Sequence, residues 1–406
     1  MSVASGSPSV LDVRLAGRGS RSGARRVVTI ATCGGDLAMT ETIPTTAETE
    51  RRDALAEQLF QATIGTQELM HVYVGDRLGL YAALADLDSA SPGELAERAG
   101  IAKRYAREWL EQQAVAGVLD VIEETDDPLA RRYRLPGGAT DVLCDPDSLF
   151  FLAPLAQLAI SIAQTLPEVV AAFRTGDGVP FEAYGEDIRA GIERINRPMF
   201  RHQLAAEWVP ALPDIEERLR RSDPPASVAD LACGSGWSTI ALARNYPAAK
   251  VDGIDIDQAS IGAARRNAAD ASLGGRVTFA CRDAADPALA GRYDLVTIFE
   301  ALHDMAHPAE VLRAARGMLT QGGAVLIGDE RVAETFTAPG DDLERFNYGW
   351  SALHCLAVAL VEPKAAGTGT VIRAETVRRY AAEAGFERVN VLPIEHDFWR
   401  FYRLDD

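Results

Sequence analysis

The chain has 406 residues, 47 % hydrophobic and 25 % charged, a composition ordinary for a globular protein with room for two or three domains. The formal net charge of −18 opposes nucleic-acid binding, because contacts to a phosphate backbone depend on Lys and Arg. Five cysteines with no CxxC pair predict free thiols and a reducing, cytoplasmic compartment; they are at positions 33, 144, 233, 281 and 355.

Residues 1–46 are predicted to be a disordered leader, because residues 1–38 are rich in Ser, Gly and Arg. Arg25-Arg26 before VVTIATC suggests an export signal, but the apolar stretch is short and no A-x-A-like site follows. Met39 is a more natural start, so we interpret residues 1–38 as an upstream extension. No apolar run reaches the ~18 residues of a membrane span, so no membrane partner is expected.

Residues 47–147 are predicted to form a winged-helix dimerisation domain. Apolar residues recur every three or four positions from Ala47, which indicates a long helix. Ser91-Pro92 and Gly100 bound a short helix, another is predicted over Lys103–Ala116, and LDVIEE and RYRL form the wing. DNA binding is the alternative, which the acidic chain opposes. An apolar first helix without an obvious partner predicts a homodimer.

Residues 148–222 are mostly helical in pattern, with a break at TGDGVPFEAYG, and we interpret them as a linker that covers the site. The segment RRSDPPAS ends this linker. In residues 223–406, β-runs alternate with helices predicted at 237–245, 258–270, 308–319 and 374–384. This alternation predicts a Rossmann-like, doubly wound α/β sheet, and two final β-runs without a helix between them predict an antiparallel end.

The first β-run ends in DLACGSGW, a glycine loop that leads into a helix. Glycines let the backbone approach a ligand, and the helix N-terminus adds free N–H donors. Asp255 ends the second β-run about 20 residues later, where a ribose-binding acid is expected. Asp283 ends the third and is placed to accept from an adenine amino group.

Thr239 stands where the dinucleotide fingerprint has its third small residue, and no P-loop Lys follows the loop. A ligand with ribose and adenine but without phosphates needs a carboxylate near the loop, which Asp230 supplies. S-adenosylmethionine (SAM) has these features, and its ammonium matches Asp230.

In order and spacing, DLACGSG, GIDID, CRDA and YDLVTIFEALHD resemble the motifs of class I SAM-dependent methyltransferases over about 180 residues. With the winged helix, VPFEAYG and INRPMF, the chain resembles plant and bacterial small-molecule O-methyltransferases and actinobacterial winged-helix methyltransferases. The resemblance implies SAM as cofactor, S-adenosylhomocysteine as product, and this cofactor-binding set: Asp230, Ala232, Gly234, Gly236, Asp255, Ile256, Asp283, Ala284 and Glu300.

Three positions depart from the family pattern. Ala232 replaces the usual first Gly, and if that position needs positive φ the alanine costs roughly 1 kcal/mol. Met305 replaces a Trp after the His-Asp pair, and Tyr184 replaces the motif His. The last two departures indicate that the acceptor pocket differs from the family's.

His303 follows the end of the β-run YDLVTIFE and is predicted to be the general base that removes a proton from the acceptor. Glu330 is the candidate for orienting it, with Asp304 as the alternative. A purely structural His303 stays open, because some methyltransferases act by proximity alone. His307 lies one helical turn later, but no third ligand is obvious, so no metal is expected.

The acceptor pocket is predicted from residues 336–372 and the linker, with GTGTV as a lid. Tentative acceptor contacts are Tyr184, Met199, Tyr348, Trp350 and His354. The sequence thus predicts a SAM-dependent methyltransferase of secondary metabolism that O-methylates a small aromatic-like molecule at a hydroxyl or carboxyl. Two alternatives stay open, namely N-, C- or S-transfer or a non-methylating reaction on the same fold, and a SAM-responsive DNA-binding regulator.

Overall fold

The computed structural model describes residues 27–30, 37–40, 45–123 and 125–406. The chain divides into two units, residues 1–67 and 68–406. In the first, β1 (Val27–Ile30) pairs antiparallel with β2 (Leu37–Thr40), and α1 (Thr46–Arg77) begins. This ladder lies where the sequence predicted only a disordered leader; the rest of residues 1–44 lies outside the described residues.

The predicted winged-helix pattern is present in the second unit. A capping box opens α3: Glu94 N–H donates to the Ser91 side chain, and the Glu94 carboxylate accepts from Ser91 N–H. Gly100, with φ 69°, ends that helix. The elements are α2 (Leu80–Leu87), α3 (Pro92–Ala99), α4 (Lys103–Val115), the antiparallel wing β3 (Asp120–Glu123) and β4 (Arg132–Arg134), and α5 (Ala139–Leu143).

The linker is helical, as predicted. Its elements are α6 (Pro154–Thr175), η1 (Phe181–Tyr184), α7 (Gly185–His202), η2 (Leu204–Trp208), η3 (Val209–Ala211) and α8 (Pro213–Arg220). By length and composition alone, α6 is a candidate membrane span that the sequence pattern had not indicated. One face of it is buried, with Leu158 packed on Gly191 of α7, as a core helix packs.

A seven-stranded sheet with the order β10-β11-β9-β8-β5-β6-β7 forms the C-terminal part. The strands are β5 (Ser227–Leu231), β6 (Lys250–Asp255), β7 (Val277–Cys281), β8 (Tyr293–Phe299), β9 (Leu319–Glu330), β10 (Arg388–Val391) and β11 (Trp399–Asp405). Strands β5 to β9 are parallel, whereas β11 pairs antiparallel with both β9 and β10. The predicted antiparallel end is confirmed.

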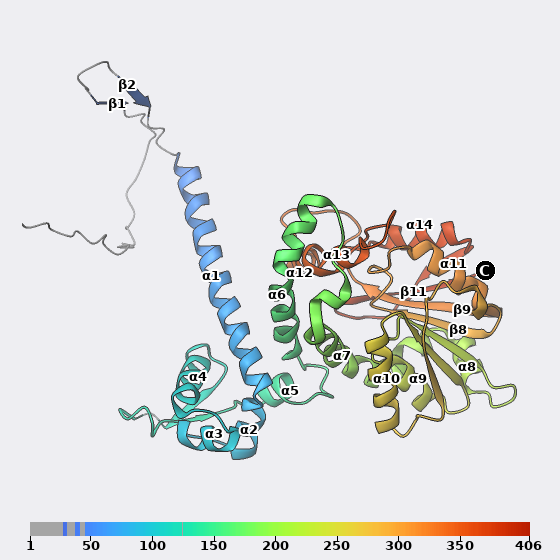
Figure 1. Ribbon diagram of the computed structural model, residues 1–406, viewed down its shortest axis with the longest axis horizontal. Coiled ribbons are helices and arrows are strands. Elements are labelled where there is room, and N and C mark those ends of the chain that lie inside the picture. Colours follow the sequence, from blue (N-terminus) through green and yellow to red (C-terminus); the bar gives the residue numbers. More distant parts are fainter. Residues whose placement is uncertain (1–26, 31–36, 41–44, 124) are drawn as a thin grey trace, which may run out of the picture. The chain divides into compact units, whose positions relative to one another are not determined.

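Helices cover both faces of this sheet (Figure 1). On one face lie α8, α9 (Trp237–Asn245) and α10 (Gln258–Asp270), and on the other α11 (Pro308–Met318) and α14 (Ala374–Ala384). The central strands are apolar on both sides, as a doubly covered parallel sheet requires. Between β9 and α14 the chain forms α12 (Asp342–Trp350), the π-helical turn η5 (Ser351–Cys355) and α13 (Leu356–Ala359). The strand order changes direction at β5, so the carboxyl ends of β5 and β8 frame a ligand crevice.

Candidate active site

The loop from β5 into α9 has an unusual backbone. Ala232, Gly234 and Gly236 have φ of 54°, 52° and 82°. Gly236 caps α9, and a Cβ there would lie 2.8 Å from the Phe279 ring and 2.9 Å from the Ala264 Cβ. The glycines therefore serve both a left-handed turn and close packing, and Ala232 carries the strain that the sequence predicted.

Asp255, at the end of β6, lies beside this loop. Its two carboxylate oxygens accept from the backbone N–H groups of Gly234 and Asp257, each at 2.8 Å. Burial raises the pKa of this carboxyl, and the two N–H donors oppose that effect. The next residue, Ile256, is 72 % exposed and stands free at the strand end. Asp255 is thus suited to accept hydrogen bonds from ribose hydroxyls, and Ile256 is suited to pack against a nucleobase.

Asp230 is held by three hydroxyl groups of the protein. It is 1 % exposed, and its oxygens accept from the hydroxyls of Ser238 and Thr239 at 2.6 Å and of Thr297 at 2.7 Å. Burial raises its pKa, although these hydroxyls oppose the shift. The carboxylate therefore ties β5, β8 and the start of α9 together, and its main partners belong to the protein.

A cavity of about 480 Å³ opens over the carboxyl ends of β5 to β8. Most of the predicted cofactor-binding set lines it: Asp230, Ala232, Gly234, Asp255, Ile256, Asp283, Ala284 and Glu300. Gly236 does not line the cavity and acts through packing instead. Asp304, Met305 and His307 extend the wall past β8, and Val358 and Val361 close it from the α13 side.

Helix α7 forms one wall of the cavity, and the sequence pattern had not identified which of its residues do so. Arg189 forms a two-point ion pair with Asp257, at 2.8 and 3.2 Å, which ties α7 to the start of α10. Asn196 donates to Glu300, and Glu193 accepts from Trp237 Nε1 at 2.9 Å. The stretch INRPMF contains Asn196, so the resemblance pointed to the segment, but only the fold shows which side chains meet the sheet.

Two glutamates lie at the ends of β8 and β9: Glu330 is buried, and Glu300 is half-buried in the cavity wall. Burial raises the pKa of Glu300 to about 7, with the Asn196 hydrogen bond opposing the shift. Burial and the nearby Glu300 raise the pKa of Glu330 well above its usual value. Glu300 has φ 50°, a conformation that a non-glycine side chain rarely adopts. Glu300 therefore ionises close to neutral pH, and Glu330 holds its proton more tightly than an ordinary carboxyl.

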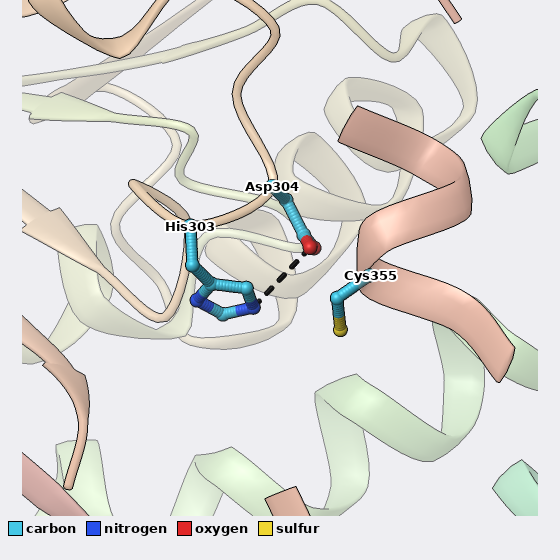
Figure 2. A group of neighbouring side chains, drawn as sticks. All are labelled: His303, Asp304 and Cys355. Atoms are coloured by element: carbon cyan, nitrogen blue, oxygen red, sulfur yellow. Dashed lines mark ion pairs between the residues drawn. The ribbon is translucent and has the colours of Figure 1, made fainter. Parts of the chain in front are cut away.

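His303 is held between two carboxylates, neither of which is Glu330. Its Nδ1 lies 2.6 Å from Oδ1 of Asp329, whose other oxygen accepts from His303 N–H at 3.3 Å. Its Nε2 lies 3.2 Å from Oδ1 of Asp304 (Figure 2). Burial lowers the pKa of His303, but the two carboxylates outweigh burial and raise it well above the usual value.

The orienting residue is thus Asp329, one position before the predicted Glu330. Successive side chains of a strand point to opposite faces of the sheet, so a shift of one residue changes the neighbour completely. His303 is 2 % exposed and does not line the cavity, whereas Asp304 does. His307 pairs with Glu362 at 3.2 Å and not with His303.

None of the five predicted acceptor contacts lines the cavity. Tyr184 is buried and donates to Leu353 O at 2.9 Å, and Met199 packs against the core beside α7. Tyr348 contacts Arg373, and Trp350 packs among the residues of α6 and α7. His354 is 3 % exposed. The GTGTV segment is bonded to the His303 loop through Gly369 N–H and does not form part of the cavity wall.

Comparison with known proteins supports the two-part organisation. Residues 228–323 match the model of a methyltransferase domain, and residues 66–144 match that of an Rv2258c-like winged HTH domain. One relative, the 4-amino-L-phenylalanine/4-methylamino-L-phenylalanine methyltransferase of Streptomyces pristinaespiralis, is 41 % identical over 86 residues. That match covers 21 % of this chain and 29 % of the relative, so the chain spans less than a third of that relative's length.

Solved structures share the whole architecture. A putative O-methyltransferase from Nostoc punctiforme has a TM-score of 0.64 at 18 % identity, covering 90 % of this chain and 100 % of that one. Human N-acetylserotonin methyltransferase in complex with SAM has a TM-score of 0.66 at 16 % identity, covering 87 % and 97 %. The chain therefore joins a winged helix-turn-helix domain to a methyltransferase domain in the class I SAM-dependent methyltransferase fold.

Proposed function

We propose that the protein is a SAM-dependent methyltransferase that O-methylates a hydroxyl or carboxyl of a small, aromatic-like molecule. The observation that carries this proposal is the single cavity wall that runs from the glycine loop and Asp255 to Asp304. The proposal is supported by this continuity, because residues suited to a nucleoside and a carboxylate suited to an acceptor line the same cavity. The relatives with this fold include proteins named as O-methyltransferases.

The residues present fit SAM. Asp255 is oriented by two backbone N–H groups and keeps further lone pairs for ribose hydroxyls. Ile256 is free to support an adenine ring, and Asp283 lies at the end of β7, where it can accept from the amino group. When bound, SAM supplies a methyl group on a positively charged sulfur, which an acidic cavity favours.

At the acceptor side, Asp304 is the group that reaches the cavity, with His303 and Asp329 behind it. We therefore assign the contact with the acceptor to Asp304, which relays the single acceptor proton to Nε2 of His303 in its neutral form. Asp329 fixes the imidazole ring. Alignment of the acceptor oxygen with the methyl group and exclusion of water supply the rest of the rate enhancement.

The test is a labelled-methyl assay in extract from the source organism, with products identified by mass spectrometry. Wild type should give a product heavier by one methylene, and Asp304→Asn and His303→Ala should each lower its rate about 10²–10⁴-fold. His202→Ala is the matched control, because His202 does not line the cavity. Full activity in both site variants would leave proximity alone as the mechanism.

Cofactor binding is tested separately by calorimetry. Asp255→Ala should weaken SAM binding about 10–100-fold, because it removes charged acceptors of ribose hydrogen bonds. Wild-type protein that gives no heat with SAM would contradict the proposal.

N-methylation is the second candidate. The methyltransferase from Streptomyces pristinaespiralis is named for an amino group on an aromatic ring, and Asp304 offers a negative charge that suits an amine. A product methylated on nitrogen in the same assay would establish this candidate in place of the first.

A further inference from the structure

Three side chains of different chemistry meet behind the cavity wall. The Nε2 atom of His303, a carboxylate oxygen of Asp304 and Sγ of Cys355 all lie within 4.8 Å of one another. Figure 2 shows the imidazole and the carboxylate facing each other, with the sulfur close to both. Two of the residues follow β8, and Cys355 ends the π-helical turn η5, a local form that often occurs at functional sites.

Nε2 of His303 and Oδ1 of Asp304 form an ion pair at 3.2 Å. Oδ1 of Asp304 is buried and has no hydrogen bond of good geometry among the described residues. A separation of 3.2 Å also suits two ligands at an edge of a tetrahedron whose centre holds a metal at about 2.0–2.2 Å from each.

The surroundings supply the supporting bonds that a metal site needs. Asp329 lies 2.6 Å from Nδ1 of His303, which leaves Nε2 as the ligand nitrogen; carboxylate–histidine–metal triads have this arrangement. On the other side, Nδ1 of His354 lies 3.3 Å from Sγ of Cys355, close enough to donate to a thiolate.

Further buried polar atoms around Cys355 lack partners. Nε2 of His354 and Oγ1 of Thr370 have none among the described residues, and both side chains are 3 % exposed. Buried polar groups are nearly always hydrogen-bonded, so orphans gathered at one place indicate a missing ligand, water or ion. His354 is in contact with the cluster through Nδ1, and Oδ1 of Asp304, which also lacks a partner, is one of the three donors.

We propose that His303, Asp304 and Cys355 bind a thiophilic divalent cation of the Zn²⁺ class. One imidazole, one carboxylate and one thiolate form a ligand set that favours Zn²⁺ or Co²⁺ over Mg²⁺ or Ca²⁺, which prefer oxygen ligands alone. Three protein ligands leave a fourth position open, and Asp304 lines the cavity on that side. On binding, the thiol proton of Cys355 and any proton on Nε2 are released to solvent.

The consequence rests on the proposed function. The cation would occupy Nε2 of His303 and Oδ1 of Asp304, the atoms assigned to receive the acceptor proton. Cation and acceptor proton therefore compete for one site, and the metal-bound protein is the inhibited form. Metal binding itself does not depend on methyl transfer, so the two proposals can fail separately.

The experiment is an anaerobic titration of the untagged, full-length chain with Co²⁺, followed by absorption spectroscopy. Wild type should bind one equivalent and develop a thiolate-to-cobalt charge-transfer band together with the visible bands of a tetrahedral ion. Cys355→Ser, which keeps the side-chain volume, should lose the charge-transfer band. Asp329→Asn should keep the band but weaken binding about 10–100-fold. Cys144→Ala is the matched control with its thiol outside the cluster, and its titration should equal that of wild type.

Absence of the band in wild type, or a band that persists in Cys355→Ser, would overturn the site. The proposed competition between cation and acceptor proton is tested by activity: Zn²⁺ should lower the methyl-transfer rate of wild type at least tenfold more than that of Cys355→Ser. A rate that rises with Zn²⁺ would overturn the competition and make the ion an activator. SAM calorimetry on the same samples separates the outcomes: SAM binding without a cobalt band contradicts only the metal site, and a cobalt band without SAM binding contradicts only the proposed function.

Discussion

Two side chains of the cavity wall, Ala232 and Glu300, stand on backbone with positive φ. Both follow the end of a central strand, where the chain must turn sharply to leave the sheet and frame the ligand crevice. Local strain of this kind persists only where the surrounding structure fixes the conformation, and it is common at functional sites. Each residue supports a prediction.

Ala232→Gly should stabilise the protein by about 1 kcal/mol. At φ 54° the Cβ of alanine is unfavourable, and glycine removes that cost. Urea unfolding of the two proteins measures the change. Ala269→Gly, on the exposed side of α10, is the matched control and should destabilise by about 1 kcal/mol, because glycine weakens an ordinary helix. A loss of stability in both variants would show that Ala232 is not strained.

Glu300 makes the stability depend on pH. Its pKa is raised from an ordinary 4.5 to about 7, so the folded state holds this proton where the unfolded state has lost it. This contribution to the free energy of unfolding is greatest below pH 4.5 and falls as the pH rises to 7, by on the order of 3 kcal/mol. Glu300→Gln removes the ionisation.

The melting temperature of Glu300→Gln, relative to wild type, should therefore rise when both are measured from acidic to slightly alkaline pH. Glu383→Gln, on the exposed side of α14, should show no such trend. A constant difference between Glu300→Gln and wild type at every pH would mean that Glu300 ionises normally.

At the scale of elements, the site depends on how closely α9 approaches β7 and α10. Gly236→Ala adds a Cβ within 3 Å of the Phe279 ring and Ala264, at a residue with φ 82°. Overpacking and strain together should cost about 2–4 kcal/mol and weaken SAM binding, because the loop must shift. Thermal unfolding and calorimetry measure the two effects.

Gly262→Ala is the control for that prediction. Gly262 lies within α10, and its nearest atom to an added Cβ is a flexible Arg266 nitrogen at 3.6 Å. Alanine there should stabilise by up to about 1 kcal/mol and leave SAM binding unchanged. Equal losses of stability in the two alanine variants would contradict the packing argument for Gly236.

At the scale of the whole molecule, exposed apolar side chains suggest self-association. Leu166, Val170 and Phe173 lie along one face of α6 at helical spacing, and Phe173 is 71 % exposed. The homodimer was predicted from the helices of residues 50–85 and the winged helix; we propose that it buries this face of α6 instead. Light scattering should give twice the chain mass, and Phe173→Glu should shift it toward the monomer, because a charge would be buried at the interface. Tyr105→Glu, at a 77 % exposed position of α4, is the charge-matched control, and a monomeric wild type would contradict the dimer.

The winged helix is not expected to bind DNA. Arg104 pairs with Glu108, and both Arg107 and Arg131 pair with Glu111, so the basic residues of α4 and the wing meet acids of the same module. The net charge of −18 opposes contacts to a phosphate backbone. Duplex binding that weakens steeply with added salt, measured by fluorescence anisotropy, would reverse this conclusion.

The sequence by itself determined the order and type of the main elements of the methyltransferase domain. Helices α9, α10 and α14 begin and end at the predicted residues, because glycine, aspartate and hydrophobic spacing set these boundaries locally. It also placed Asp255 and Asp283 at the cavity, since strand ends in an open α/β sheet share one edge. Ala232 was recognisable as strained for the same reason, because a glycine loop requires positive φ.

Only the tertiary structure decided which side chains meet. The choice of Asp329 over Glu330 depends on which face of β9 turns toward His303, and neighbouring residues of a strand point in opposite directions. Cys355 lies 52 positions after His303 and joins it only when η5 packs against the end of β8. The predicted aromatic contacts pack outside the cavity wall, among them Trp350 in the core of α6 and α7. An aromatic side chain suits a packed core as well as a cavity wall, and no local sequence pattern distinguishes the two.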